Sequence, residues 1–283
     1  MSKKKFRVNL LIAEIPFQVI FLGADNNLQK KITGYYENFT IPSRDFRKNL
    51  DIVNIEINFL IRKPKKTASR PRLPYCKNEI FIWEHKGKFQ GKVDLKKRKA
   101  KFFCLNSMFY INRILRVTCS LHIIQNNGLL LHASSILRND SGYVFFGHQN
   151  AGKSTIIKLL DGEVLSDDTT ILRPIEKKFF IFSSPFDPKI QNVRNFKVEL
   201  KTLFLLGKSK FDKISLVTNN SFLLIYNHTR PNLKFIKNCD NLKSRTFQNI
   251  SLLIEKKSIY SLRFKKGLNV RKVVNEFDAK HQS

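Results

Sequence analysis

The sequence predicts an α/β fold with a mixed β-sheet, preceded by a small β-rich region at the N-terminus. The second half of the chain alternates short apolar runs, rich in aromatic and β-branched residues, with stretches of helical periodicity. One such run, Tyr143 to Phe146, is followed by a glycine-containing loop and then by a helical pattern. The first 105 residues read instead as short strands with polar turns. We therefore expect a β-rich region over residues 1–105 and a core domain over residues 106–283.

The remaining elements follow from the same patterns. In the N-terminal region, strands are expected at Phe6–Ala13, Phe17–Leu22, Ile52–Ile61 and, in two pieces, Ile80–Leu95. Apolar residues at helical spacing predict a helix over Ser107–Gln125 that links this region to the core domain. Later strands are expected at Glu163–Ser166, Phe179–Phe182, Val198–Leu206 and Ile259–Phe264, and later helices at Asn241–Lys256 and Val270–Phe277. Trp83 and the 25 phenylalanines are expected in the core.

The glycine-containing loop has the pattern of a phosphate-binding loop, G-x-x-x-x-G-K-[ST]. Residues 147–154 read Gly-His-Gln-Asn-Ala-Gly-Lys-Ser, and a helical pattern from Ser154 to Leu160 follows. Glycines let the backbone pass close to phosphates, a lysine reaches the terminal phosphates, and the next hydroxyl can bind Mg²⁺. The loop therefore predicts binding of ATP and Mg²⁺, and the residues expected to hold the nucleotide are Gly147, His148, Gln149, Asn150, Ala151, Gly152, Lys153, Ser154 and Thr155.

An acidic pair follows the very next expected strand. Asp167 and Asp168 come directly after Glu163–Ser166, and Asp168 lies 15 residues beyond Lys153. Ligands bind at the ends of strands in open α/β sheets, and adjacent carboxylates there can divide two tasks. One holds Mg²⁺ while the other accepts a proton from an attacking hydroxyl. We assign the metal to Ser154 and Asp168, although the sequence leaves open which aspartate does which. An ordinary solvated turn is the alternative.

The order of these motifs resembles a known family. Gly128 to Ser134, with His132 inside it, precedes the strand Tyr143–Phe146 and the loop, and Val164 to Asp168 and Ser183 to Phe186 follow. This series is similar to the HPr kinase/phosphorylase-like proteins, whose P-loop core is related in fold to phosphoenolpyruvate carboxykinase. The resemblance implies phosphoryl transfer from ATP, with catalytic roles for His132, Lys153, Asp167 and Asp168. Without it, His132 in an apolar stretch would be taken as a core residue.

The chain also departs from that family. Its bifunctional members carry a glycine-rich Arg-Gly segment after the Asp-Asp strand, tied to recognition of HPr, and the sequence has no counterpart. The acceptor hydroxyl is therefore left open between a protein and a small molecule. Two other functions stay open: an NTPase that couples hydrolysis to a partner, and a non-catalytic nucleotide-binding module with a basic surface for nucleic acid.

The net charge of +30 is the strongest indication of that basic surface. Basic residues exceed acidic ones in both halves of the chain, and two local runs stand out: Arg62–Lys66 with Arg70–Arg72, and Lys96–Lys99 with Lys101. Abundant Lys, Asn, Ile and Phe with scarce Ala and Gly would follow from an AT-rich gene alone. Nucleic acid is therefore a possible partner but less favoured than an acceptor for phosphate. An acidic protein substrate drawn to the basic surface fits the charge at least as well, and a homo-oligomer stays open.

The sequence further predicts a cytoplasmic protein that does not span a membrane. Glu14, Pro16 and Gln18 interrupt the apolar run that follows the basic N-terminus, so it does not fit a secretory signal. No run approaches the length of a membrane span. The four cysteines are scattered without a C-x-x-C pair, which predicts reduced thiols and no zinc site.

Overall fold

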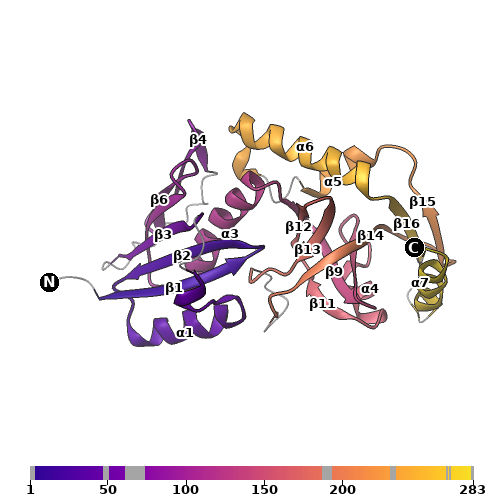
Figure 1. Cartoon of the computed structure of the whole chain (residues 1–283), viewed down its shortest axis with the longest axis horizontal. Helices are drawn as coiled ribbons and strands as arrows, with labels where there is room; N and C mark the ends of the chain where they lie inside the picture. Colours follow the sequence, from indigo (N-terminus) through magenta and orange to yellow (C-terminus); the bar gives the residue numbers. More distant parts are fainter. Residues whose placement is uncertain are drawn as a thin grey trace. The chain divides into compact units, whose positions relative to one another are not determined.

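The computed structural model of the chain describes residues 4–46, 51–60, 74–186, 193–229, 234–265, 267 and 269–281. The chain divides into two compact units, each of which contains a sheet with helices (Figure 1). The first comprises Met1–Asn126 and Leu233–Arg245, and the second Asn127–Asn232 and Thr246–Ser283. Helix α3 (Met108–Gln125) thus counts with the first unit. The domain boundary expected at residues 105 and 106 stays a prediction.

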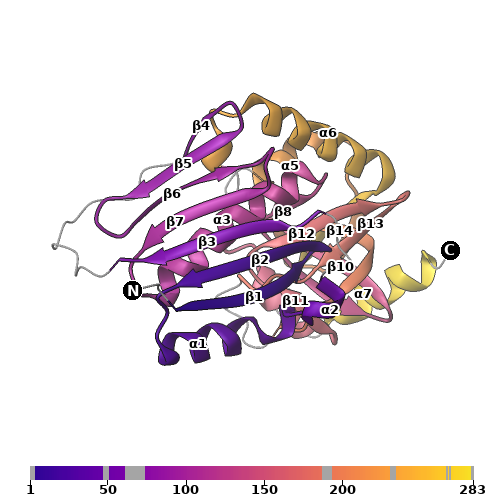
Figure 2. The ribbon, with the colours of Figure 1, turned by 60° about the vertical axis from the view of Figure 1, so that its left-hand side comes forward.

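The first unit contains, among its described residues, a seven-stranded sheet in the order β1-β2-β3-β7-β6-β5-β4 (Figure 2). The pairs β2–β3 and β3–β7 are parallel, and the others are antiparallel. The strands are β1 (Lys5–Ile12), β2 (Ile15–Leu22), β3 (Val53–Phe59), β4 (Tyr75–Lys77), β5 (Ile80–His85), β6 (Phe89–Asp94) and β7 (Lys99–Cys104). The strands expected in this region are confirmed, whereas β4 and β7 were not expected.

Helices cover one face of this sheet. Helix α3 packs its His122 ring on Phe17 of β2 and its Tyr110 ring near Phe89 of β6. Helix α1 (Asn26–Tyr36) is joined to α3 by the bond from Tyr36 to Asn112. A single-turn 3-10 helix η1 (Glu37–Phe39) and the short helix α2 (Ser43–Phe46) follow. The alternation of buried and exposed residues in β7 shows that the opposite face is left to solvent.

The second unit contains a mixed sheet, as expected. Seven of its nine described strands run in the order β11-β9-β10-β14-β13-β12-β8. The other two are β16, which pairs with β14, and β15, which pairs with β16. Strand β14 is parallel to β10 and to β16, and antiparallel to β13. The strands are β8 (Leu129–Leu131), β9 (Ala133–Arg138), β10 (Ser141–Phe146), β11 (Glu163–Ser166), β12 (Thr170–Ile175), β13 (Lys178–Phe182), β14 (Lys197–Lys208), β15 (Lys213–Leu216) and β16 (Ile259–Phe264).

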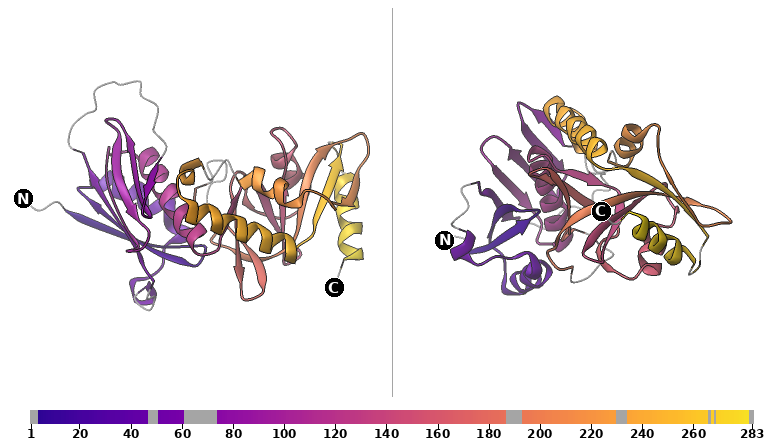
Figure 3. Two further views of the ribbon diagram at one scale, coloured as in Figure 1. Left: turned by 90° about the horizontal axis from the view of Figure 1, so that it is seen from above. Right: turned by 45° about the vertical axis from the view of Figure 1, so that its right-hand side comes forward.

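Side-chain alternation in β10 divides the core of the second unit between two faces. Val144 and Phe146 pack with Ile225 of α5 (Ser221–Thr229) and Ile250 of α6 (Asp240–Lys256). On the other face, Tyr143 and Phe145 pack with residues of α4 (Lys153–Leu159) and α7 (Asn269–Lys280). This is a three-layer α/β/α arrangement, and the right-hand view of Figure 3 shows these strands between the two helical layers. The helices expected after Tyr143–Phe146 and toward the C-terminus are confirmed.

The aromatic residues are mostly but not all in the core. Trp83 and most described phenylalanines are buried, but Phe103, Phe109, Phe211 and Phe247 are exposed, so the expectation that all of them are core was wrong.

The run at Lys96–Lys99 forms the turn between β6 and β7 and the start of β7, whereas the run Arg62–Lys66 with Arg70–Arg72 lies outside the described residues. All four cysteines are free and buried, and no described helix is long and apolar enough to cross a bilayer.

Candidate active site

A cavity of about 1050 Å³ lies in the second unit where β10 ends and α4 begins. Every residue from Gly147 to Thr155 lines it, so the structure brings together the nine residues expected to hold the nucleotide. The other lining residues come from distant parts of the chain: His132, Lys208, Ser209, Asn227, His228, Phe264 and Lys265. Lys208 and Lys265 stand at the ends of the parallel strands β14 and β16.

The backbone of the loop depends on its two glycines. Gly152 has φ of +101°, a left-handed conformation that side chains disfavour, and a Cβ there would lie 2.8 Å from Cζ of Phe264. A Cβ on Gly147 would lie 3.0 Å from both Cβ of Ala151 and the backbone oxygen of Leu206. The loop therefore passes too close to β14 and β16 for larger residues, which explains the glycine spacing of the motif.

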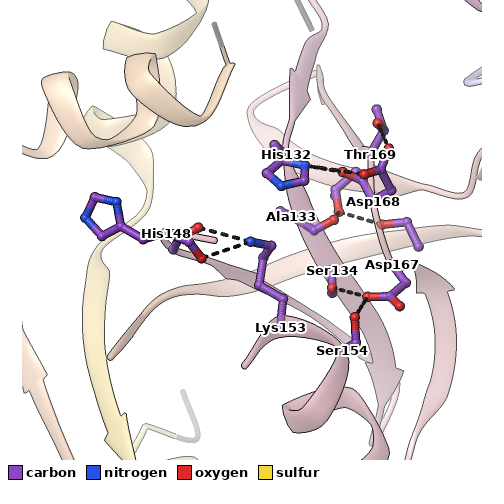
Figure 4. Close-up of polar contacts among 12 residues, drawn as sticks. His132, Ala133, Ser134, His148, Lys153, Ser154, Asp167, Asp168 and Thr169 are labelled. Atoms are coloured by element: carbon purple, nitrogen blue, oxygen red, sulfur yellow. Dashed lines mark hydrogen bonds and ion pairs between the residues drawn. The ribbon is translucent and has the colours of Figure 1, made fainter. Parts of the chain in front are cut away.

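Lys153 holds its ammonium group over this loop. Its Nζ donates hydrogen bonds to the backbone oxygens of Gly147 (3.1 Å) and His148 (3.3 Å), as Figure 4 shows. The ring of His148 points away from Lys153 in the same view. The described residues that line the cavity include three lysines and three histidines, and none of them is an aspartate or a glutamate. The cavity wall is therefore cationic, which suits a polyanionic ligand.

Asp167 lies behind the loop and receives two hydroxyl hydrogen bonds at the same oxygen. Ser154 Oγ donates to its Oδ1 at 2.8 Å, and Ser134 Oγ of β9 donates to the same Oδ1 at 2.7 Å (Figure 4). The residue is only 7% exposed. Two hydroxyl donors offset the cost of burying the carboxylate and fix its orientation toward Ser154.

Asp168 faces a different partner. His132 Nδ1 lies 3.1 Å from the backbone oxygen of Asp168 and 3.5 Å from its Oδ1. Thr169 Oγ1 donates to the other carboxylate oxygen at 3.2 Å. His132 sits at the bend between β8 and β9, and its own backbone N–H donates to the backbone oxygen of His228 at 2.8 Å. The four expected catalytic residues are thus gathered, but neither aspartate lines the cavity directly.

The two aspartates contact different partners, and the sequence left open which aspartate has which partner. The sequence pattern favoured Ser154 and Asp168 as metal ligands, but the carboxylate bonded to Ser154 is that of Asp167. Asp168 instead adjoins His132, which lines the cavity. Both aspartates lie in the bend that follows β11, where Asp167 contacts Ser134 and Ser154 and Asp168 contacts His132 and Thr169.

His228 is a lining residue that sequence reasoning missed. It lies at the C-terminal end of α5, with its ring 5.1 Å from that of Phe146 and 6.3 Å from that of His148. Burial, and then electrostatic interaction with Lys153, His148 and His132, lowers the pKa of His228 to about 4. Its ring is therefore neutral at physiological pH. No local pattern marks this histidine, because only the fold brings α5 to the loop.

Comparisons with known proteins add little to this geometry. No family model matches the chain, and no curated protein matches it. Among solved structures, the HPr(Ser) kinase/phosphatase from Coxiella burnetii matches with 12% identity over 54% of this chain and 99% of that chain, at a TM-score of 0.32. A match at that score is too weak to bear on the fold or activity of this chain.

Proposed function

We propose that the chain is a Mg²⁺-dependent phosphotransferase that moves the terminal phosphoryl group of ATP to a hydroxyl acceptor. The proposal rests on the arrangement of the loop that contains Lys153 and Ser154. Lys153 is held over a cationic cavity, and the next residue, Ser154, is hydrogen-bonded at 2.8 Å to the buried carboxylate of Asp167. Phosphoryl transfer depends mainly on positioning and charge stabilisation, and this loop offers both.

The cavity wall supports the assignment of its ligand to a nucleotide triphosphate. Lys153 would neutralise the terminal phosphates, and Lys208 and Lys265 would add positive charge from the ends of β14 and β16. The volume of about 1050 Å³ is ample for a nucleotide. His228, being neutral, would contribute a polar ring rather than a charge.

The residues present also fit Mg²⁺. Ser154 Oγ and Asp167 Oδ1 are 2.8 Å apart, close to the separation of about 3.0 Å between adjacent oxygens in an octahedron of bonds about 2.1 Å long. Among the described residues, no group of three His, Cys, Asp or Glu side chains could hold a metal alone. Mg²⁺ would therefore rely on nucleotide phosphates and water for its other ligands, as it commonly does, and would neutralise phosphate charge.

The remaining carboxylate is assigned to proton transfer. A quarter of the Asp168 side chain is exposed, and its neighbour His132 lines the cavity. Asp168 would accept the proton of the acceptor hydroxyl, and His132 would orient its carboxylate. The sequence pattern favoured Asp168 as the metal ligand without deciding the roles, and the contact between Ser154 and Asp167 is the reason to assign the metal to Asp167 instead.

The acceptor is a protein hydroxyl or a small-molecule hydroxyl. The motif order from His132 to Asp168 resembles the HPr kinase/phosphorylase-like family, which supports a kinase. The lack of the Arg-Gly segment removes the basis for naming HPr itself. A cytoplasmic enzyme fits the expected reduced thiols, all four of which are free.

The test is turnover of labelled ATP with Mg²⁺ in the presence of lysate from the source cells. We expect label to pass from the γ-phosphate to a lysate component, and Lys153→Ala to abolish the transfer. Lys158→Ala is the matched control, because Lys158 is an exposed lysine of the same helix that does not line the cavity.

Each other result points to a specific alternative. Release of free phosphate without a labelled acceptor would indicate an NTPase. Nucleotide binding without turnover would indicate a binding module, and transfer that survives Lys153→Ala would show that the loop is not the active site.

A further inference from the structure

The first unit carries a second surface, distinct from the cavity. Its sheet is covered by α1 and α3 on one face, and the other face presents exposed side chains from β1, β4, β5, β6 and β7. We call this the open face. The strand register places one row of its residues across all seven strands: Tyr75, Ile82, Lys92, Lys101, Glu56, Ile20 and Arg7. A neighbouring row contains Glu84, Gln90, Phe103, Asn58, Leu22 and Lys5.

We propose that the open face binds single-stranded nucleic acid. The proposal is independent of the phosphotransferase proposal, because it concerns the other unit and none of the cavity residues.

Charge is the first argument. The basic side chains on the open face are Lys5, Arg7, Lys77, Lys92, Lys99 and Lys101, and the acidic ones are Glu56, Glu84 and Asp94. Lys101 forms an ion pair of 2.9 Å with Glu56, and this contact lowers the pKa of the Glu56 carboxyl. The excess of positive charge on a flat, exposed sheet fits a polyanion that follows the strands or crosses them.

Exposed rings among the cations are the second argument, and they favour nucleic acid over an acidic polypeptide. Phe103 is 38% exposed and Tyr75 is 53% exposed, although both lie on strands that bury their other face. Lys101 Nζ lies 5.9 Å from the centre of the Phe103 ring. An aromatic ring beside a cation can stack a base while the cation meets the adjacent phosphate. A purely acidic peptide would gain nothing from these rings.

Size is the third argument. The row from Tyr75 to Arg7 crosses six strand-to-strand steps, which at about 4.8 Å each gives a path of roughly 29 Å. That length accommodates several nucleotides, as on other sheet platforms that bind single strands through stacked bases.

The test is fluorescence anisotropy with fluorescein-labelled oligo(U) and oligo(dT) of about 12 nucleotides, at two salt concentrations. We expect both probes to bind the full chain, with affinity that falls steeply as salt rises. The double variant Lys92→Ala/Lys101→Ala should weaken binding about tenfold or more and flatten the salt dependence. The matched control is Lys30→Ala/Lys31→Ala on α1, which removes the same charge from the covered side and should change affinity less than about twofold.

Phe103→Leu separates stacking from charge and keeps an apolar side chain at an exposed position. We expect it to weaken binding of either oligonucleotide about fivefold or more without changing the salt slope. The comparison of oligo(U) with oligo(dT) shows whether RNA or DNA is preferred.

Three results would overturn the proposal. The first is that neither oligonucleotide binds. The second is an equal loss in both lysine double variants. The third is that polyglutamate competes as well as oligo(U) while Phe103→Leu has no effect, which would identify the face as a site for acidic proteins.

Discussion

At the scale of single residues, the charge state of His228 reports on the cavity. Its pKa is lowered to about 4 by burial first and by Lys153 next. Replacing Lys153 with methionine removes the positive charge but keeps the length of the side chain. We predict that Lys153→Met raises the pKa of His228, as measured by NMR titration of the histidine ring protons.

The matched control for this titration is Lys158→Met, which leaves the cavity wall unchanged. An unchanged His228 pKa in Lys153→Met, or an equal shift in both variants, would show that Lys153 does not lie near His228 in solution.

The division between the two aspartates shows what residue-level sequence reasoning can and cannot reach. Spacing from Lys153 located both carboxylates, because the short connection leaves room for one helix and one strand. The pairing of Ser154 with Asp167 joins residues 13 positions apart, and that of His132 with Asp168 joins residues 36 positions apart. Both are contacts between different elements of the fold, and no local pattern encodes them.

At the scale of elements, the connection from β10 to α4 depends on Gly152. We predict that Gly152→Ala destabilises the protein by about 1–3 kcal/mol, because alanine must adopt a strained positive φ and its Cβ would lie 2.8 Å from Phe264. Urea unfolding measures the change. Nucleotide affinity should fall as well, since the loop would have to move away from β16.

Gly34→Ala provides the opposite case. Gly34 lies inside helix α1, and a Cβ there would meet nothing within 4 Å. This change should leave stability the same or raise it by about 0.5–1 kcal/mol, because alanine is the better helix former. If the two substitutions changed the free energy of unfolding by the same amount, the result would argue against the positive φ of Gly152 in the loop.

The elements themselves were predictable in part. The strand, loop and helix around residues 143–160 and the strand at 163–166 have strong local patterns, and they form as expected. Strand β7 was missed because its buried residues alternate with lysines that read as a charge run. Strand β9 was missed because Ser134 and Ser135, buried by contacts with Asp167 and Ser166, look like turn residues in sequence.

At the scale of the whole molecule, buried histidines predict a stability that depends on pH. Burial lowers the pKa of His122 to about 3 and that of His228 to about 4, against about 6.5 in an unfolded chain. Below about pH 6.5, these histidines bind protons in the unfolded chain but stay neutral in the folded protein. The free energy of unfolding should therefore be highest above about pH 6.5 and fall as pH drops toward about 4.

Urea unfolding at several pH values checks this slope, and His122→Leu identifies its source. His122 is fully buried against Phe17, and one such group contributes at most about 1.4 kcal/mol per pH unit. The variant should lose stability less steeply on acidification than the natural protein does. Parallel pH curves for the two proteins would show that His122 is not buried in its neutral form.

We propose above all that the loop with Lys153 and Ser154, together with Asp167, binds Mg²⁺ and ATP. The most direct measurement is calorimetric titration of ATP with and without Mg²⁺ into the natural protein and into Asp167→Asn and Asp168→Asn. We expect Mg²⁺ to strengthen ATP binding by the natural protein and by Asp168→Asn, but not by Asp167→Asn. Failure of the natural protein to bind ATP, or an equal effect of Mg²⁺ on both variants, would contradict it.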